Sequence, residues 1–208
     1  MKLRLLLSAI AAVAALGLPA VSIADSIGPN CTTCQGSVYT LEYGGAPIAT
    51  TATTETYRIT LTIDTSGYNG PGVQLNAVAI KVSSMLVSMS LLDAPDGAAA
   101  WTTWMGGLNA NGCSNGGSGF ECAYAGLHGV TVPDGSYSWI FDLTMNTGVL
   151  FTTPNSSSIK VRYIDANGVK AGDIVSENIT LQAIPEPTTV ALLGSGVLAL
   201  ASARRRRG

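Results

Sequence analysis

Charged side chains are scarce in this sequence, and this scarcity limits what the protein can bind. Asp, Glu, Lys and Arg together make up 12% of the 208 residues, against about 25% in ordinary soluble domains. Six of the eleven basic residues lie at the two ends, so residues 25–184 carry five basic and twelve acidic side chains and a net charge near −7. A nucleic-acid-binding protein needs a basic surface to replace the counterions of phosphate. The charge balance therefore predicts no nucleic-acid partner.

Histidine is almost absent as well. His128 is the only one, and residues 116–119 read Gly-Gly-Ser-Gly before Phe120, so no Gly-x-Ser-x-Gly motif is present. Serine and cysteine hydrolases need a histidine base beside their nucleophile. We therefore interpret His128 as an ordinary loop or strand-end residue and expect no catalytic residues.

The sequence shows no dense group of metal ligands. Asp165-Ala166-Asn167-Gly168, with Asp173 further on, faintly resembles a calcium loop. It lacks the third oxygen ligand and the closing glutamate at the EF-hand spacing. Asn-Gly is typical of a two-residue hairpin turn with positive φ at both central positions. We expect a hairpin turn here, and neither a metal site nor a cofactor.

The sequence neither predicts nor excludes a catalytic pair of carboxylates for glycan cleavage, because the two members of such a pair come together only in the folded protein. Glu42, Glu55, Glu121 and Asp142 lie on or near predicted strands. Ordinary solvent-facing residues at strand positions would give the same pattern. A secreted enzyme that acts on a glycan is therefore the alternative to a non-enzymatic protein, which we favour.

The N-terminal residues 1–24 have the three parts of a secretory signal peptide. A basic start precedes the apolar run 5–18, and small residues stand at Ser22 and Ala24, so cleavage after Ala24 is predicted. The alternatives are an uncleaved anchor helix and a buried N-terminal helix. An apolar run of 14 residues is short of the roughly 20 that a membrane span needs, which favours cleavage and export.

The C-terminal tail, residues 185–208, combines a proline-rich turn, an apolar stretch and a basic end. Residues 188–203 contain no charge, and sixteen helical residues rise only about 24 Å against a hydrocarbon core of about 30 Å. Such a marginal transmembrane helix suits a temporary anchor. Basic flanks stay cytoplasmic, so residues 25–184 are predicted to lie outside the inner membrane. The residues that define the tail are Pro185, Glu186, Pro187, Arg204, Arg205, Arg206 and Arg207.

These parts, in this order and behind a signal peptide, resemble the tail of the PEP-CTERM proteins of Gram-negative bacteria. The resemblance covers 24 of the 208 residues. It implies sorting by exosortase, a membrane-embedded cysteine protease that recognises the tail. It also implies transient anchoring in the inner membrane and then a place at the cell surface or in the extracellular matrix, where such proteins often accompany exopolysaccharide. The resemblance implies nothing about the activity of residues 25–184.

Residues 25–184 are predicted to form one exported, all-β domain. Residues 57–64 alternate between apolar and polar side chains, as a half-buried strand does, and twenty glycines separate short apolar stretches. The pattern predicts an antiparallel β-sandwich of about eight or nine strands, flanked by the signal helix and the C-terminal apolar helix. The expected strands cover 37–43, 57–64, 73–82, 86–92, 120–127, 136–145, 158–164 and 174–184.

The four cysteines are predicted to form disulfides, because their number is even and the chain is exported. They are Cys31, Cys34, Cys113 and Cys122. Four cysteines allow three connectivities, and we favour nearest-neighbour pairing. A four-cysteine zinc site would need two tight pairs, and the 113–122 spacing is too open for one.

The segment 98–119 looks like a long irregular excursion from the sandwich. It contains Trp101, Trp104, Asn109 and Asn111, which could form a platform on which a sugar stacks. The alternative is that the tryptophans cover an open edge or end of the sandwich, because aromatic side chains most often bury area.

Overall fold

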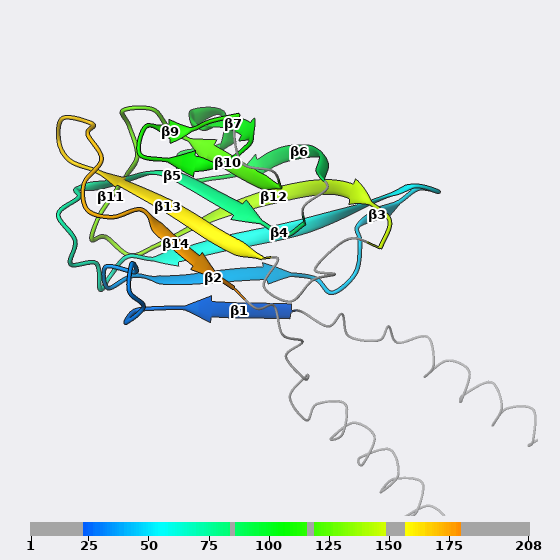
Figure 1. The fold of residues 1–208 in the computed structure, drawn as a ribbon, viewed down its shortest axis with the longest axis horizontal. Helices are drawn as coiled ribbons and strands as arrows, with labels where there is room; N and C mark the ends of the chain where they lie inside the picture. The colour runs from blue at the N-terminus through cyan, green and yellow to red at the C-terminus, as the bar shows by residue number, and fades with distance from the viewer. Residues whose placement is uncertain (1–22, 84–85, 116–118, 149–156, 180–208) are drawn as a thin grey trace, which may run out of the picture.

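The computed structural model describes residues 23–83, 86–115, 119–148 and 157–179. Their strands form two antiparallel sheets of six strands each and a separate two-stranded hairpin, packed in layers (Figure 1). Within these ranges the only helical element is the short 3-10 turn η1, Ala98–Ala100. The all-β, antiparallel prediction is confirmed. The expected signal helix and C-terminal apolar helix lie outside the described residues.

Sheet A is built around its two longest strands, which run side by side over eleven residue pairs. In β4 the apolar side chains of Tyr57, Ile59, Leu61 and Ile63 are buried, whereas the alternate residues between them are at least partly exposed. This is the period of two that the sequence shows. The strand order is β1 (Ile23–Ile27), β2 (Val38–Tyr43), β4 (Thr54–Asp64), β12 (Ser136–Asn146) and β6 (Leu86–Asp93), with β3 (Ala49–Thr50) beside β4.

Sheet B has a central strand, β5, that is buried on both faces. Its inward residues Val78 and Ile80 belong to the main core, whereas Ala77 and Ala79 face outward into a smaller cluster. The strand order is β14 (Val175–Asn178), β13 (Ser158–Ile164), β5 (Gln74–Lys81), β10 (Phe120–Tyr124) and β7 (Thr102–Met105), with β11 (Val130–Thr131) beside β5. The remaining strands, β8 (Leu108–Asn109) and β9 (Gly112–Cys113), form the separate hairpin.

The main core lies between the two sheets. Its largest fully buried side chains include Trp139 and Phe141 from sheet A and Tyr163 from sheet B. Burying such side chains is the dominant favourable contribution to folding. Because both sheets contribute to one continuous cluster, the arrangement is a β-sandwich.

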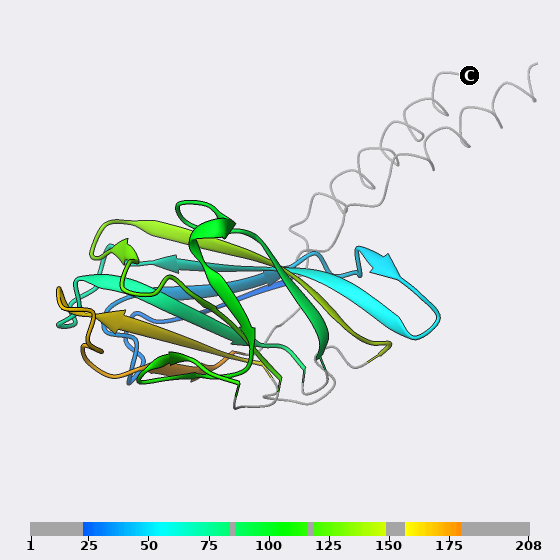
Figure 2. The same ribbon diagram turned by 90° about the horizontal axis from the view of Figure 1, so that it is seen from above.

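Strand β1 begins and strand β14 ends at the same end of the sandwich, which we call the termini end (Figure 1). The β3–β4 hairpin projects from this end as well (Figure 2). The opposite, far end carries the loops β1–β2, β4–β5 and β13–β14. Two residues of β1, Ile23 and Ala24, precede the predicted cleavage site and pair with Tyr43 and Glu42.

Three details differ from the sequence-based expectation. Short strands, and β1 at the edge of the predicted signal peptide, raise the strand number above eight or nine. The described part of segment 98–119 is not irregular, because it contains η1 and the strands β7, β8 and β9. Of Asn167 and Gly168 only Gly168 has a positive φ, 79°, so the pair does not form the expected two-residue turn with positive φ at both positions. Instead the Asp165 carboxylate accepts hydrogen bonds from the backbone N–H groups of Asn167 and Val169.

Candidate functional site

The sorting-motif residues lie outside the described residues. They are Pro185, Glu186, Pro187 and the arginines at 204–207. Within the described ranges, no helix is long and apolar enough to cross a membrane.

Trp101 does not belong to a sugar-binding platform. Its side chain is 5% exposed, packs edge to face on Trp139 with ring centroids 5.2 Å apart, and donates a hydrogen bond from Nε1 to the Pro95 carbonyl oxygen at 2.8 Å. The Trp101 ring is therefore buried in the main core rather than offered to a sugar. A large aromatic surface with one polar atom is most stable where the ring is buried and its N–H is bonded.

The other three residues of the predicted platform lie on the outward side of sheet B. Trp104 is half-buried opposite Cys122 and lies 6.1 Å from Tyr124, centroid to centroid. Asn109 and Asn111 are exposed in the β8–β9 turn, where the Asn111 backbone N–H donates to Asn109 Oδ1 at 2.8 Å. These asparagines shape the turn, and Trp104 and Tyr124 form an aromatic pair in which both side chains stay partly exposed.

The β8–β9 hairpin is fastened onto the outward face of sheet B. Leu108 and Cys113 pack against Ala77 and Ala79, and the Cys113–Cys122 disulfide joins the hairpin to β10 with the Cα atoms 5.7 Å apart.

Arg162 adds a polar attachment between this hairpin and sheet B. Its Nε donates to the Ala110 carbonyl and its Nη1 to Asn76 Oδ1, both at 2.9 Å. Asn76 is fully buried and in turn donates to the Gly126 carbonyl. Charge-assisted hydrogen bonds of this kind are among the stronger polar contacts in proteins. The hairpin is therefore held by a covalent bond, apolar packing and a buried polar network.

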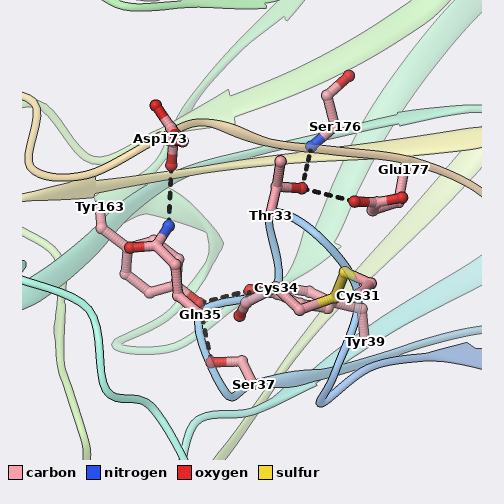
Figure 3. Close-up of a disulfide and its surroundings, with 10 residues drawn as sticks. All are labelled: Cys31, Thr33, Cys34, Gln35, Ser37, Tyr39, Tyr163, Asp173, Ser176 and Glu177. Carbon is pink, nitrogen blue, oxygen red and sulfur yellow. Dashed lines mark hydrogen bonds between the residues drawn. A yellow bond between two sulfur atoms is a disulfide. The ribbon is translucent and has the colours of Figure 1, made fainter.

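The second disulfide, Cys31–Cys34, lies in the β1–β2 loop at the far end and completes the nearest-neighbour connectivity. Figure 3 shows how this loop reaches β14 of the other sheet. Thr33 Oγ1 donates to Glu177 Oε1 at 2.6 Å and accepts from the Ser176 backbone N–H at 3.3 Å. The loop therefore joins the edge strand of sheet A to the edge strand of sheet B.

Two tyrosine hydroxyls meet beneath this loop (Figure 3). Tyr39 donates to the Cys34 carbonyl at 3.1 Å, and its hydroxyl lies 2.9 Å from that of Tyr163. The Ser37 hydroxyl lies 3.1 Å from the same Tyr163 oxygen. Burial raises the pKa of Tyr163 to about 12, so these hydroxyls stay neutral at physiological pH.

The four carboxylates considered for glycan cleavage do not gather on one face. Glu42 and Asp142 lie on the outward face of sheet A, and Asp142 forms a bidentate ion pair with Arg58, with both N–O distances 2.9 Å. Glu55 accepts a hydrogen bond from the Tyr57 hydroxyl. Glu121 lies at an inward position of sheet B.

Glu121 is the most unusual of these groups. It is 1% exposed, its Oε2 has no hydrogen-bond partner, and burial raises its pKa to about 8. The sequence does hold a signal for this position, because Glu121 alternates with the outward residues Phe120 and Cys122 on β10. Without the register of β10 that signal does not say which side faces the core.

His128 is exposed in the β10–β11 loop, where its backbone N–H donates to the Ala125 carbonyl. The described residues contain no group of three or more His, Cys, Asp or Glu side chains arranged to hold a metal ion. The calcium-like segment at Asp165 is the turn reported above. The Asp165 carboxylate accepts hydrogen bonds from backbone N–H groups, and these lower its pKa.

Comparison with protein families gives one match. Residues 183–207 fit the family model described as the PEP-CTERM protein-sorting motif. No curated protein and no solved structure matches the chain. The tail of this chain is therefore a PEP-CTERM sorting motif, which implies an exported protein that is transiently anchored in the membrane and sorted by exosortase.

Proposed function

We propose that the chain is a non-enzymatic protein of the cell surface or extracellular matrix that contacts exopolysaccharide after exosortase has processed its tail. The observation that carries this proposal is the sorting motif at residues 183–207 behind a disulfide-bonded β-sandwich. Structural disulfides are typical of exported domains, which fold under oxidising conditions.

The chemistry of the described residues supports a non-enzymatic role. A glycoside hydrolase needs two carboxyl groups about 5 to 9 Å apart on either side of the scissile bond. Here Asp142 is neutralised by Arg58 on an outward face, whereas Glu121 is buried at an inward position of the other sheet. These two groups cannot flank one sugar.

The path of the chain supports display at a surface. Because β1 begins and β14 ends at the termini end, a domain attached through its C-terminal end would hold its far end and both sheet faces away from the attachment point. The hairpin on sheet B, with Trp104 and Tyr124 beside it, would then be accessible to extracellular material.

Binding through this pair is expected to be weak. Aromatic stacking contributes about 1 kcal/mol, and part of this is offset by the water that sugar hydroxyls lose. Many copies at one surface would give useful avidity from such weak contacts. The pair Trp104–Tyr124 therefore replaces the four-residue platform predicted from sequence.

The test is a pull-down of the processed protein, produced in a host that contains exosortase, on that host's own exopolysaccharide. We expect retention of the unmodified protein and reduced retention of Trp104→Ala. Leu127→Ala is the matched control, because Leu127 is 68% exposed in the β10–β11 loop. Absence of retention, or depolymerisation of the glycan by the unmodified protein, would refute the proposal.

A further inference from the structure

On sheet B the basic and acidic side chains lie on different faces, and the net charge of the domain does not show this separation. Of the five basic residues in 25–184, three lie at outward positions of sheet B: Lys81 on β5, and Lys160 and Arg162 on β13. Lys81 stands between the core residues Ile80 and Val82, and this alternation turns its side chain outward.

Among the residues that the structure describes, no carboxylate occupies an outward strand position of this sheet. Only two acidic residues occur on the strands of sheet B, and both occupy inward positions. Glu121 is directly opposite Ile80, and Glu177 is directly opposite Ile159, and both isoleucines belong to the main core. The outward face of sheet B therefore carries positive charge only, on a domain whose net charge is near −7.

Two of the three cations converge on one aromatic ring. Lys160 Nζ lies 4.7 Å and Lys81 Nζ 5.6 Å from the centroid of Phe120. The register explains this convergence, because Phe120 and Ser158 both pair with Lys81, and Lys160 is two residues beyond Ser158. All three side chains are half-buried, so their positions are restricted by the sheet beneath them.

Neither ammonium group has an anionic partner among the described residues. The ion pair found there joins Arg58 to Asp142 on the other sheet. Attraction to a ring face is weak at exposed sites, whereas two cations at one ring repel each other. An anion placed between them would relieve that repulsion, and the nearby Arg162 adds a third positive charge that hydrogen bonds fix in place.

We propose that the surface formed by Lys81, Phe120 and Lys160 binds acidic polysaccharide. The two ammonium groups would pair with carboxylates on the sugar units, and the Phe120 ring would contact a C–H face between them. This inference rests on the proposed function and deepens it, because it specifies a polyanionic glycan and a binding surface distinct from the Trp104–Tyr124 pair.

Duplex nucleic acid fits this surface less well. Nucleic acid carries one charge per about 1.7 Å of helix axis, and proteins bind it by neutralising many phosphates at once. Here two free ammonium groups are available, and the excess of acidic over basic residues in 25–184 would repel a rod of high charge density. An acidic polysaccharide has more widely spaced charges and offers apolar sugar faces between them.

The experiment measures retention of the processed, full protein on polygalacturonate, with neutral dextran and duplex DNA as comparison matrices. We expect retention on polygalacturonate that weakens as salt rises, little retention on dextran, and a roughly tenfold weaker apparent affinity for Lys81→Gln/Lys160→Gln, since each lost contact is worth a few-fold. Phe120→Leu should lower retention as well, because it keeps an apolar side chain but removes the ring.

The single variant Lys160→Gln should weaken retention a few-fold. Lys170→Gln is its control, because it makes the same charge change at the far end, where Lys170 donates to the Gly172 carbonyl. It should bind as the unmodified protein does. Unfolding midpoints matched to the unmodified protein establish that the variants are folded. Equal retention of Lys160→Gln and Lys170→Gln, or tighter binding to DNA than to polygalacturonate, would overturn the inference. If the host exopolysaccharide is retained and polygalacturonate is not, the inference fails while the proposed function stands.

Discussion

The hydroxyl of Tyr39 on sheet A meets the hydroxyl of Tyr163 on sheet B at 2.9 Å inside the sandwich. This contact lies directly beneath the Cys31–Cys34 loop, because Tyr39 also donates to the Cys34 carbonyl. Tyr68 stacks on the Tyr163 ring with centroids 4.3 Å apart. Two layers that share a mainly apolar core are thus also joined by a polar contact next to the disulfide loop.

Removing the Tyr39 hydroxyl should destabilise the domain. Tyr39→Phe leaves the buried Cys34 carbonyl and the Tyr163 hydroxyl without this partner, which costs about 1–3 kcal/mol. Urea unfolding of the oxidised protein measures the change. Tyr137→Phe is the control, because Tyr137 donates to the Thr131 carbonyl at an exposed position and should lose less. Equal losses for both variants would show that the cross-sheet contact is unimportant for stability.

The buried Glu121 should make stability depend on pH. Its ordinary pKa of 4.5 is raised to about 8 in the folded state by burial. The folded state therefore holds the proton more tightly than the unfolded state, so this contribution is complete below about pH 4.5 and is lost as the pH rises to about 8. We expect the free energy of unfolding to fall across this window by up to about 1.4 kcal/mol per pH unit.

Glu121→Gln tests this dependence, because an amide does not titrate. Urea unfolding between pH 4.5 and 8 should give a flatter profile for Glu121→Gln than for the unmodified protein. Glu42→Gln, which changes an exposed carboxylate of β2, should leave the profile as it was. Identical slopes for the unmodified protein and Glu121→Gln would contradict the assignment.

The two tryptophans of segment 98–119 should lose very different amounts of stability on truncation. Trp101→Ala removes a side chain that is 5% exposed and packed on Trp139, at a cost of about 3–5 kcal/mol. Trp104→Ala removes a half-buried side chain from an edge strand and should cost less than about 1 kcal/mol. Thermal or urea unfolding of both variants decides the point. A larger loss for Trp104→Ala would reverse the roles assigned to them.

All four cysteines should be oxidised in protein recovered from the cell surface. Alkylation without reductant, followed by peptide mapping, should find Cys113 linked to Cys122 and Cys31 linked to Cys34. Cys113→Ser/Cys122→Ser should lower the free energy of unfolding by about 2–4 kcal/mol and release the hairpin from sheet B. Free thiols in the recovered protein, or cross-linked peptides of another connectivity, would contradict this arrangement.

Most long strands could be predicted from the sequence because their patterns are local. Tyr57–Asp64 alternates with period two and lies within β4, and most of the described glycines fall between strands, as expected. Strand β1 was not predicted, because its first residues, Ile23 and Ala24, also fit the end of a signal peptide. Strands β8 and β9 have two residues each, too few for any periodicity to show.

The surfaces could not be predicted because they depend on which strands are neighbours. Trp101 and Trp104 are three residues apart in the sequence, yet one packs into the main core and the other lies on the outward side of sheet B. Lys81, Phe120 and Lys160 come from three separate strands and meet only through the order β13–β5–β10. The sorting motif could be predicted, because its residues are close together in the sequence and recognising them does not require knowing how strands pair.

Intact-mass measurement of the protein recovered from a host that contains exosortase tests the central claim most directly. We predict a mature chain that begins at Asp25 and ends near Pro185–Pro187, with both disulfides formed and the terminal arginines removed. The same gene expressed in a host without the protease should keep its tail. A mass from the exosortase host that still includes Arg204–Arg207 would contradict sorting by exosortase, and the account of a processed surface protein would fail with it.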